Sequence, residues 1–116
     1  MKKSITIYHN PRCGKSRCAL ELLRENGIEP KVVEYLKEVP DREAMKLLLF
    51  RLHLRPHDII RTGEEMYKKK LKGLNLNDDE WITIMLENPI LIERPIVIAG
   101  NRGVVARPPE KVLELI

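Results

Sequence analysis

The chain has 116 residues, of which 43% are hydrophobic, so it is long enough to fold around one core and too apolar to remain disordered. The net charge of +4 is compatible with nucleic-acid binding but does not require it. Only 4% of the residues are aromatic, and single-stranded nucleic acids are usually bound by stacking of their bases on aromatic rings, so we do not expect a nucleic-acid partner. No apolar run could span a bilayer and Met1-Lys2-Lys3-Ser4 does not begin a signal peptide, so we expect a cytoplasmic protein without membrane contact.

The first third of the chain has the pattern of a strand, a helix and a second strand. Residues 4–8 alternate between polar and apolar side chains, which is the period of a strand. From Gly14 the apolar spacing becomes helical, and Asn26-Gly27 is a stop signal. Residues 31–36 have the composition of a second strand. Two strands joined by a helix predict a right-handed unit with parallel strands.

The middle of the chain, residues 41–88, is predicted to be a helical insert. Asp41 can cap a helix whose apolar residues share one face, namely Met45, Leu48, Leu49 and Leu52. A short helix is expected at residues 59–61. A further helix opens at Asn77, which has the capping-box spacing to Glu80, and ends before Pro89.

The end of the chain returns to strands. Residues 96–99 and 104–106 predict a hairpin about the turn 100–103. Pro108-Pro109, followed by Val112, Leu113 and Ile116, predicts a closing helix with proline near its first turn. The order β-α-β, helical insert, β-β-α predicts an α/β fold of the thioredoxin-like type. We expect a single domain over residues 1–116.

The chain has two cysteines, and the setting of Cys13 indicates a reactive thiol. Cys13 follows a predicted strand and precedes a predicted helix, where unpaired N–H groups and the helix dipole favour an anion. A thiolate at such a position has a pKa below the ordinary value of about 8.5. Arg12, Lys15 and Arg17 add positive charge, and His9 can act as a hydrogen-bond donor or a cation.

The same helix start can bind an oxyanion, because the backbone N–H groups of residues 14–17 can point at a tetrahedral anion above the sulfur. A nucleophile and an anion site then coincide, which predicts that Cys13 is catalytic. Cys18 lies inside the helix beside Ala19, and we interpret it as a core residue, with a resolving thiol as the alternative. Ser16 stands where a Cys-x-x-Cys motif would need its second cysteine, and no metal site is predicted.

Several segments of the chain resemble the arsenate reductases of the ArsC type, which depend on glutaredoxin. They are residues 5–17, 27–30, 88–97 and 106–110, in the same order as in that family. The resemblance is to a short form that ends at Ile116, without the C-terminal extension of the best-known members.

The resemblance implies a role for each matching residue. Cys13 would be the nucleophile that attacks arsenic, and Arg61, Arg94 and Arg107 would hold the arsenate oxyanion, which suits the paired donors of guanidinium groups. Pro95 would be a cis proline facing the active-site loop. Supporting roles are expected for the residues around the cysteine, namely His9, Asn10, Gly14, Lys15, Ser16 and Arg17.

The implied reductants are glutathione, as a co-substrate, and glutaredoxin, with no bound cofactor and with the protein acting as a monomer. Two alternatives remain open at this stage. One is a different glutathione-linked thiol oxidoreductase on the same scaffold. The other is a regulator like Spx, which binds RNA polymerase without being an enzyme; many Spx proteins carry a Cys-x-x-Cys switch, whereas this chain has Cys13, Ser16 and the three candidate arginines.

Overall fold

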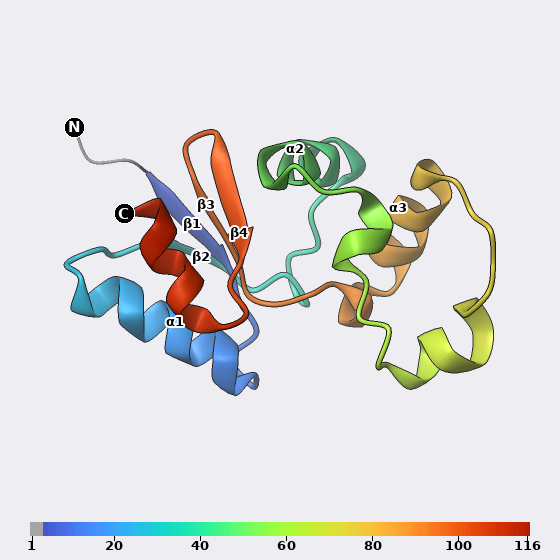
Figure 1. Cartoon of the computed structure of the whole chain (residues 1–116), viewed down its shortest axis with the longest axis horizontal. Helices are drawn as coiled ribbons and strands as arrows, with labels where there is room; N and C mark the ends of the chain where they lie inside the picture. Colours follow the sequence, from blue (N-terminus) through green and yellow to red (C-terminus); the bar gives the residue numbers. More distant parts are fainter. Residues whose placement is uncertain (1–3) are drawn as a thin grey trace. The chain divides into compact units, whose positions relative to one another are not determined.

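The computed structural model of the protein describes residues 4–116, so most of the segment 1–4 used above for the signal-peptide prediction lies outside the described residues. The chain divides into two compact units (Figure 1). One unit combines the chain up to Glu38 with Arg94–Ile116, and the other is Val39–Glu93. The expectation of a single domain with an insert at residues 41–88 stays a prediction.

The first unit contains a four-stranded sheet in the order β2-β1-β3-β4. Its strands are β1 (Ile5–Tyr8), β2 (Lys31–Val33), β3 (Ile96–Ala99) and β4 (Arg102–Val105). Strand β1 pairs in parallel with β2 and antiparallel with β3. Helix α1 (Gly14–Glu25) and the 3₁₀ helix Pro109–Leu115 lie beside each other against this sheet. The predicted order of elements and the thioredoxin-like fold are confirmed.

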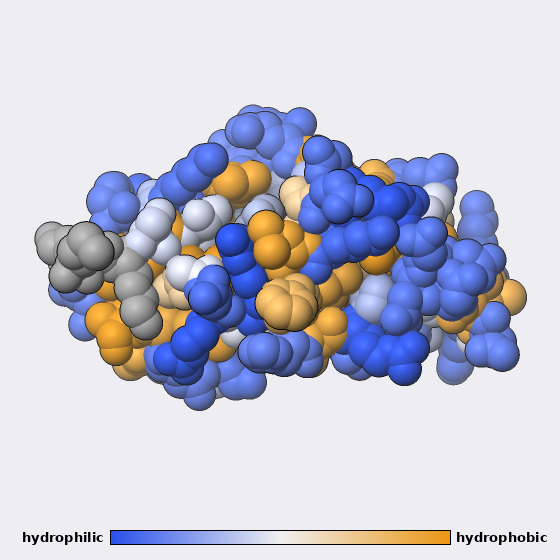
Figure 2. Space-filling view, turned by 90° about the horizontal axis from the view of Figure 1, so that it is seen from above, coloured by the Kyte–Doolittle hydropathy of each residue, from blue (hydrophilic) through white to orange (hydrophobic). Residues whose placement is uncertain are grey.

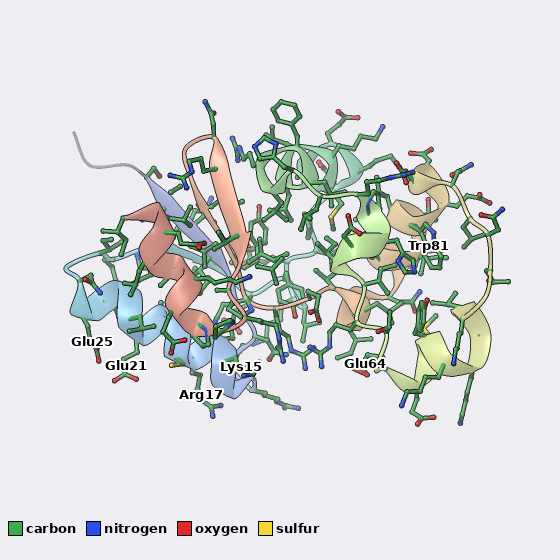
Figure 3. The ribbon with its side chains drawn as sticks, in the orientation of Figure 1. Lys15, Arg17, Glu21, Glu25, Glu64 and Trp81 are labelled. Carbon is green, nitrogen blue, oxygen red and sulfur yellow. The ribbon has the colours of Figure 1, made fainter. Side chains whose placement is uncertain are left out.

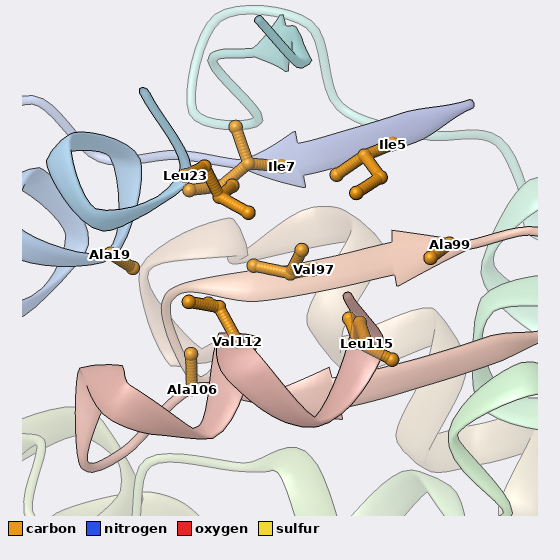
Figure 4. Packing of buried hydrophobic residues seen from close by; sticks show 9 residues of the cluster. All are labelled: Ile5, Ile7, Ala19, Leu23, Val97, Ala99, Ala106, Val112 and Leu115. Carbon is orange, nitrogen blue, oxygen red and sulfur yellow. The ribbon is translucent and has the colours of Figure 1, made fainter. Parts of the chain in front are cut away.

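The core of the first unit lies between the sheet and these two helices (Figure 4). The period of two along a strand places alternate residues of β1 and β3 on the same face, and the antiparallel register sets Ile7 opposite Val97 and Ile5 opposite Ala99. Ala19 and Leu23 of α1 close the core from the helical side. Complete burial of one such large apolar side chain contributes about 1.5–3 kcal/mol.

The first unit differs from the prediction in two strand boundaries and in the type of one helix. The second strand ends at Val33, because the chain turns at 35–37 and buries Tyr35. Strand β4 begins at Arg102, so the hairpin loop is only Gly100-Asn101, and Gly100 has the positive φ of 60° that such a tight turn requires.

The third difference concerns the type of the closing helix, which is a 3₁₀ helix over Pro109–Leu115. Its buried residues, Pro109, Val112 and Leu115, recur every three positions and therefore share one face. Leu113 and Ile116, which belong to the predicted apolar pattern, are exposed.

The second unit contains the two predicted capped helices, α2 (Arg42–Leu52) and α3 (Asp78–Glu87). The Asp41 side chain accepts from the N–H of Ala44, and Asn77 and Glu80 form both bonds of the capping box. The predicted face of α2 is buried at all four positions, Met45, Leu48, Leu49 and Leu52.

Two parts of the second unit differ from the prediction. The short helix is the 3₁₀ turn Pro56–Ile59, because Ile60 instead pairs with Ile92 in an isolated antiparallel bridge, which leaves Arg61 beyond the helix. Tyr67–Leu71 form a π-helical turn that the sequence pattern did not indicate.

Charged residues make up 33% of the chain, and Figure 2 shows hydrophilic side chains over most of one face with hydrophobic ones between them. Within residues 4–116, every helix is too short or too polar to cross a lipid bilayer.

Candidate active site

The loop between β1 and α1 holds Cys13 at the N-cap position of α1. The backbone of His9 donates to the carbonyl of Val33 at 2.8 Å, which ties the start of this loop to β2. The Cys13 N–H donates to the carbonyl of Asn10 at 2.9 Å, and the Cys13 carbonyl accepts the first helical bond from Arg17 at 3.0 Å. The thiol is therefore fixed at the positive end of a helix, as the sequence predicted.

Polar side chains are buried around this loop and are hydrogen-bonded to one another or to the loop backbone. Ser16 has no exposed surface, and its Oγ lies 2.6 Å from His9 Nδ1 and accepts from the backbone N–H of Asn10 at 3.1 Å. The Asn10 side chain accepts from the backbone N–H of Arg12 at 3.0 Å. Burial lowers the pKa of His9, against an opposing effect of Glu34, and therefore favours the neutral imidazole.

The pKa of Cys13 is lowered from its ordinary value. Partial burial acts in the opposite direction, but it is outweighed by hydrogen bonds from the backbone N–H of Ser16, from the side chain of Arg94 and from the backbone N–H of Lys15, and by the charge of Arg94. Cys13 remains partly exposed, so the stabilised thiolate is accessible.

Arg94 supplies the side-chain partner of the thiol from the segment before β3. The Arg94–Pro95 peptide bond is cis, as predicted, and Pro95 is buried. Nε and Nη1 of Arg94 are buried and have no hydrogen-bond partner in the protein. Burial acts to lower the pKa of Arg94, but its interactions with Cys13 and Tyr35 raise the pKa above the ordinary value, so this guanidinium is cationic at every accessible pH.

Arg107, the second predicted arginine, is hydrogen-bonded to the backbone of Arg94. Its Nη1 donates to the backbone carbonyl of Arg94 at 3.1 Å, so the two arginines are held together in the first unit. The Arg107–Pro108 bond is also cis, a feature that the sequence analysis did not identify. The structure thus joins the Cys13 thiol to the Arg94 guanidinium, which has hydrogen-bond donors still available. That Arg107 also holds the anion stays a prediction.

The cations beside Cys13 in the sequence contribute differently from the prediction. Arg12, Lys15 and Arg17 are exposed, and Figure 3 shows the Lys15 and Arg17 side chains at the start of α1. The main contributions to the lowered pKa of Cys13 come from Arg94 and from backbone N–H groups, including that of Lys15, rather than from these three side-chain charges. Arg17 instead donates to the carbonyl of Pro11 at 2.9 Å and so braces the loop.

Comparison with known proteins identifies the family. A model described as the ArsC family matches residues 8–115. The chain belongs to the ArsC family. It is 44% identical over 118 residues to the protein YfgD of Escherichia coli strain K12, an alignment that covers 100% of this chain and 99% of that protein. It is 40% identical over 114 residues to an arsenate reductase of Escherichia coli, covering 97% of this chain and 81% of that enzyme.

A solved structure shows the same likeness in three dimensions. The arsenate reductase from Vibrio cholerae matches with a TM-score of 0.94 and 43% identity, and the match covers 100% of both chains. The whole described fold is therefore an ArsC fold.

Arg61, the third predicted anion ligand of this ArsC chain, belongs to the second unit. It forms ion pairs with Glu64 at 3.5 Å and with Glu93 at 3.4 Å, and 22% of its side chain is exposed. Its assignment to the anion site stays a prediction, as does the supporting role of Gly14. A Cβ at Gly14 would meet the Arg17 side chain at an ordinary distance of 3.8 Å, so nothing in its surroundings requires a glycine.

The prediction that Cys18 is a core residue is wrong, because Cys18 is exposed. The buried face of α1 is formed by Ser16, Ala19 and Leu23, which recur at the helical spacing of three and four. Successive residues are turned by about 100° around a helix, so a direct neighbour of a buried residue can face solvent.

Tyr35 is a residue of this ArsC site that the sequence analysis missed. Its side chain is 1% exposed and interacts with Arg94. The pattern placed Tyr35 in a strand, and no local signal marked the turn that brings the ring inward. Among residues 4–116, no group of three or more His, Cys, Asp or Glu side chains is placed to hold a metal ion.

Proposed function

We propose that this ArsC protein reduces arsenate to arsenite through an adduct on Cys13, in the cytoplasm, with glutathione and glutaredoxin as reductants. The observation that supports this most strongly is the partly exposed Cys13 thiol, hydrogen-bonded to Arg94, whose Nε and Nη1 are buried donors without a protein partner. A buried donor without an acceptor is costly, and an oxyanion would supply the missing acceptors. Relatives named arsenate reductase match almost the whole chain.

The chemistry follows from this geometry. Arsenate is a tetrahedral anion, and the guanidinium groups of Arg94 and Arg107 can hold its oxygens while the Cys13 thiolate attacks arsenic. A sulfur–arsenic bond forms and one oxygen leaves as water or hydroxide, and the positive charge stabilises the negative charge that develops. Glutathione then attacks the adduct. The sulfur–arsenic bond breaks, and arsenic keeps its electron pair and leaves as arsenite. The two electrons come from the thiols of Cys13 and glutathione, which are joined in a mixed disulfide, and glutaredoxin reduces this disulfide and restores the Cys13 thiol.

A direct assay tests this proposal. Purified protein is incubated with arsenate, glutathione and glutaredoxin, and arsenite is measured. Cys13→Ser is expected to lower turnover by about a thousandfold or more, because the nucleophile is lost. Cys18→Ser is the matched control, since Cys18 is the other cysteine and lies exposed on α1.

Two outcomes would overturn the proposal. One is arsenite production that survives Cys13→Ser, which would remove Cys13 as the nucleophile. The other is a wild-type protein that makes no arsenite but rapidly forms a mixed disulfide between Cys13 and glutathione. That result would assign the same thiol to another oxidoreductase reaction.

A further inference from the structure

An open pocket of about 370 Å³ lies beside the Cys13 loop in the first unit. Its lining residues come from the loop and from one side of α1, and are His9, Pro11, Arg17, Leu20, Glu21 and Arg24. None of the steps proposed above uses this pocket.

The helical part of the lining is a face of α1 next to the buried one, and of its residues only Leu20 also packs against the core. Positions 17, 20, 21 and 24 follow the spacing of three and four that places residues on one side of a helix. The buried positions 16, 19 and 23 form the neighbouring face. Figure 3 shows the Arg17 and Glu21 side chains leaving α1 on the side away from the sheet.

The charges of this pocket alternate in sign and are not neutralised by one another. Arg17 precedes Glu21 by one helical turn and Arg24 follows it by one, yet within residues 4–116 neither arginine forms an ion pair with Glu21. Arg17 uses Nη1 on the carbonyl of Pro11, and Arg24 uses Nε on Glu29 at 2.9 Å. Each guanidinium therefore retains further N–H donors, and the Glu21 carboxylate is available to a cation.

The remaining lining is apolar or neutral. Leu20 is half-buried, Pro11 is exposed, and His9 is buried in a setting that favours its neutral form. A ligand that matches this lining carries two negative groups, one positive group between or beside them, and little bulk. This is the charge pattern of a small zwitterionic peptide.

We propose that this pocket binds the glutathione molecule that attacks the Cys13 adduct, with its ammonium group at Glu21 and its carboxylates at Arg17 and Arg24. The inference rests on the proposed function and adds the site of the co-substrate. Arg17 lies four residues after Cys13, about 6 Å along the helix axis, and a three-residue peptide spans about 10 Å when extended. A glutathione seated here can therefore bring its sulfur to the loop that carries Cys13.

A single charge substitution distinguishes specific binding of glutathione at this pocket from non-specific attraction of glutathione to the positively charged protein. Glutathione is a net anion at neutral pH, so removing a negative charge from the protein would lower its KM if attraction were non-specific. Binding of the ammonium group by Glu21 predicts the reverse: Glu21→Gln raises the KM for glutathione about fivefold, as one exposed charge pair allows. The kcat at saturating glutathione and the KM for arsenate should stay within about twofold of the wild-type values.

Glu25→Gln is the matched control, because Glu25 is an exposed glutamate of α1 outside the pocket lining. It makes the same change of charge and should leave the KM for glutathione unchanged or slightly lower. With N-acetylglutathione, which lacks the ammonium group, Glu21→Gln should have no effect. An equal KM for wild type and Glu21→Gln, or an equal rise for both glutamine variants, would overturn the inference.

Binding can also be followed without turnover. In the ¹⁵N-labelled Cys13→Ser protein, S-methylglutathione is expected to shift the amide resonances of Leu20, Glu21 and Arg24, and Glu21→Gln is expected to weaken this binding about fivefold. Shifts confined to other residues, or none, would overturn the inference whatever the activity. Binding at the pocket by a wild-type protein that makes no arsenite would instead overturn only the proposed function.

Discussion

The two units of the molecule differ in what they bury. The buried polar residues among those that the structure describes are His9, Asn10 and Ser16, and all three lie in the first unit within the segment that holds Cys13. In Val39–Glu93 the described buried residues are apolar, and the charged side chains are exposed or half-buried, although Nε of the half-buried Arg61 is itself buried. Burying a polar group is costly unless it is hydrogen-bonded. In the first unit these polar groups are buried and hydrogen-bonded, and their hydrogen bonds fix the geometry of the loop that holds Cys13.

The second unit is explained by general rules of helix formation. Its helices begin at capped residues, bury one apolar stripe each, and are joined through Arg42 of α2, which pairs with Asp79 of α3 at 3.0 Å and contacts Thr83. Each of these features would be expected in a helical protein of any function. The first unit contains in addition the buried polar residues His9, Asn10 and Ser16 beside the Cys13 thiol.

Replacing Arg94 tests whether the polar groups of the first unit serve the thiol. Arg94→Ala is expected to lower kcat/KM for arsenate by about a hundredfold to a thousandfold, because a group that stabilises the charge of the transition state is removed. It should also raise the pKa of Cys13, since the hydrogen bond and charge of Arg94 both lower it. The pKa is measured from the pH dependence of iodoacetamide alkylation in a Cys18→Ser background.

Arg102→Ala is the control for that measurement, because Arg102 is an exposed arginine of β4. It removes the same charge from the same unit and is expected to leave kcat/KM and the Cys13 pKa unchanged. A Cys13 pKa that does not move in Arg94→Ala would show that the helix start alone stabilises the thiolate.

The next largest effect is expected for the replacement of Ser16, and it concerns the free energy of unfolding. Ser16→Ala leaves the Asn10 N–H and His9 Nδ1 without their common partner and is expected to lower the free energy of unfolding by about 1–3 kcal/mol. The measurement is urea unfolding followed by circular dichroism. Cys18→Ala makes a similar change on the exposed side of the same helix and should stay within about 0.5 kcal/mol of the wild type. Equal losses in the two variants would mean that the buried network adds no stability.

The second unit shows how much of a fold local signals can predict. The Asp41 cap, the Asn77–Glu80 capping box and the apolar stripe of α2 each act within one or two helical turns, and the structure confirms all three. The position of Cys13 at a helix start could be predicted for the same reason, because the strand, the turn residues and the helix are neighbours in the sequence.

The candidate site depends on contacts that no local pattern encodes. Arg94 reaches Cys13 only because β3 pairs beside β1, and without the resemblance to a family nothing in the sequence around Arg94 would have joined the two. Tyr35 reaches Arg94 through a turn after a strand that was predicted too long. Cys18 was misplaced because the hydrophobicity of a neighbour does not determine which side of a helix a residue occupies.

The cap of α2 gives a smaller effect in the other unit. Asp41→Ala removes the acceptor of the Ala44 N–H and is expected to lower the free energy of unfolding by about 1 kcal/mol. Asp41→Asn keeps an acceptor at the same position and should recover most of the loss, as followed by urea unfolding. A loss of kcat/KM for arsenate as large as that expected for Arg94→Ala would contradict the division of roles between the two units.

The last predicted effect is a pH dependence that arises from His9 in the first unit. Burial lowers the pKa of His9 below its ordinary value of 6.5, so as the pH falls through 6.5 the unfolded chain takes up a proton before the folded chain does. The contribution of His9 to stability is therefore complete above pH 6.5 and decreases below it, until the folded protein is protonated as well. Urea unfolding at several pH values should show this decrease, with a slope of at most about 1.4 kcal/mol per pH unit for one proton.

His9→Asn isolates that contribution, because asparagine offers a polar atom close to the position of Nδ1 but does not titrate. The difference in unfolding free energy between wild type and His9→Asn is expected to change with pH below 6.5 and to be constant above it. Protonation of His9 would place a buried cation against Ser16, whose backbone N–H is a hydrogen-bond donor to the Cys13 thiolate. If the difference were constant at all pH values, His9 would titrate alike in both states, and the contrast between the two units would rest on Ser16 and Asn10.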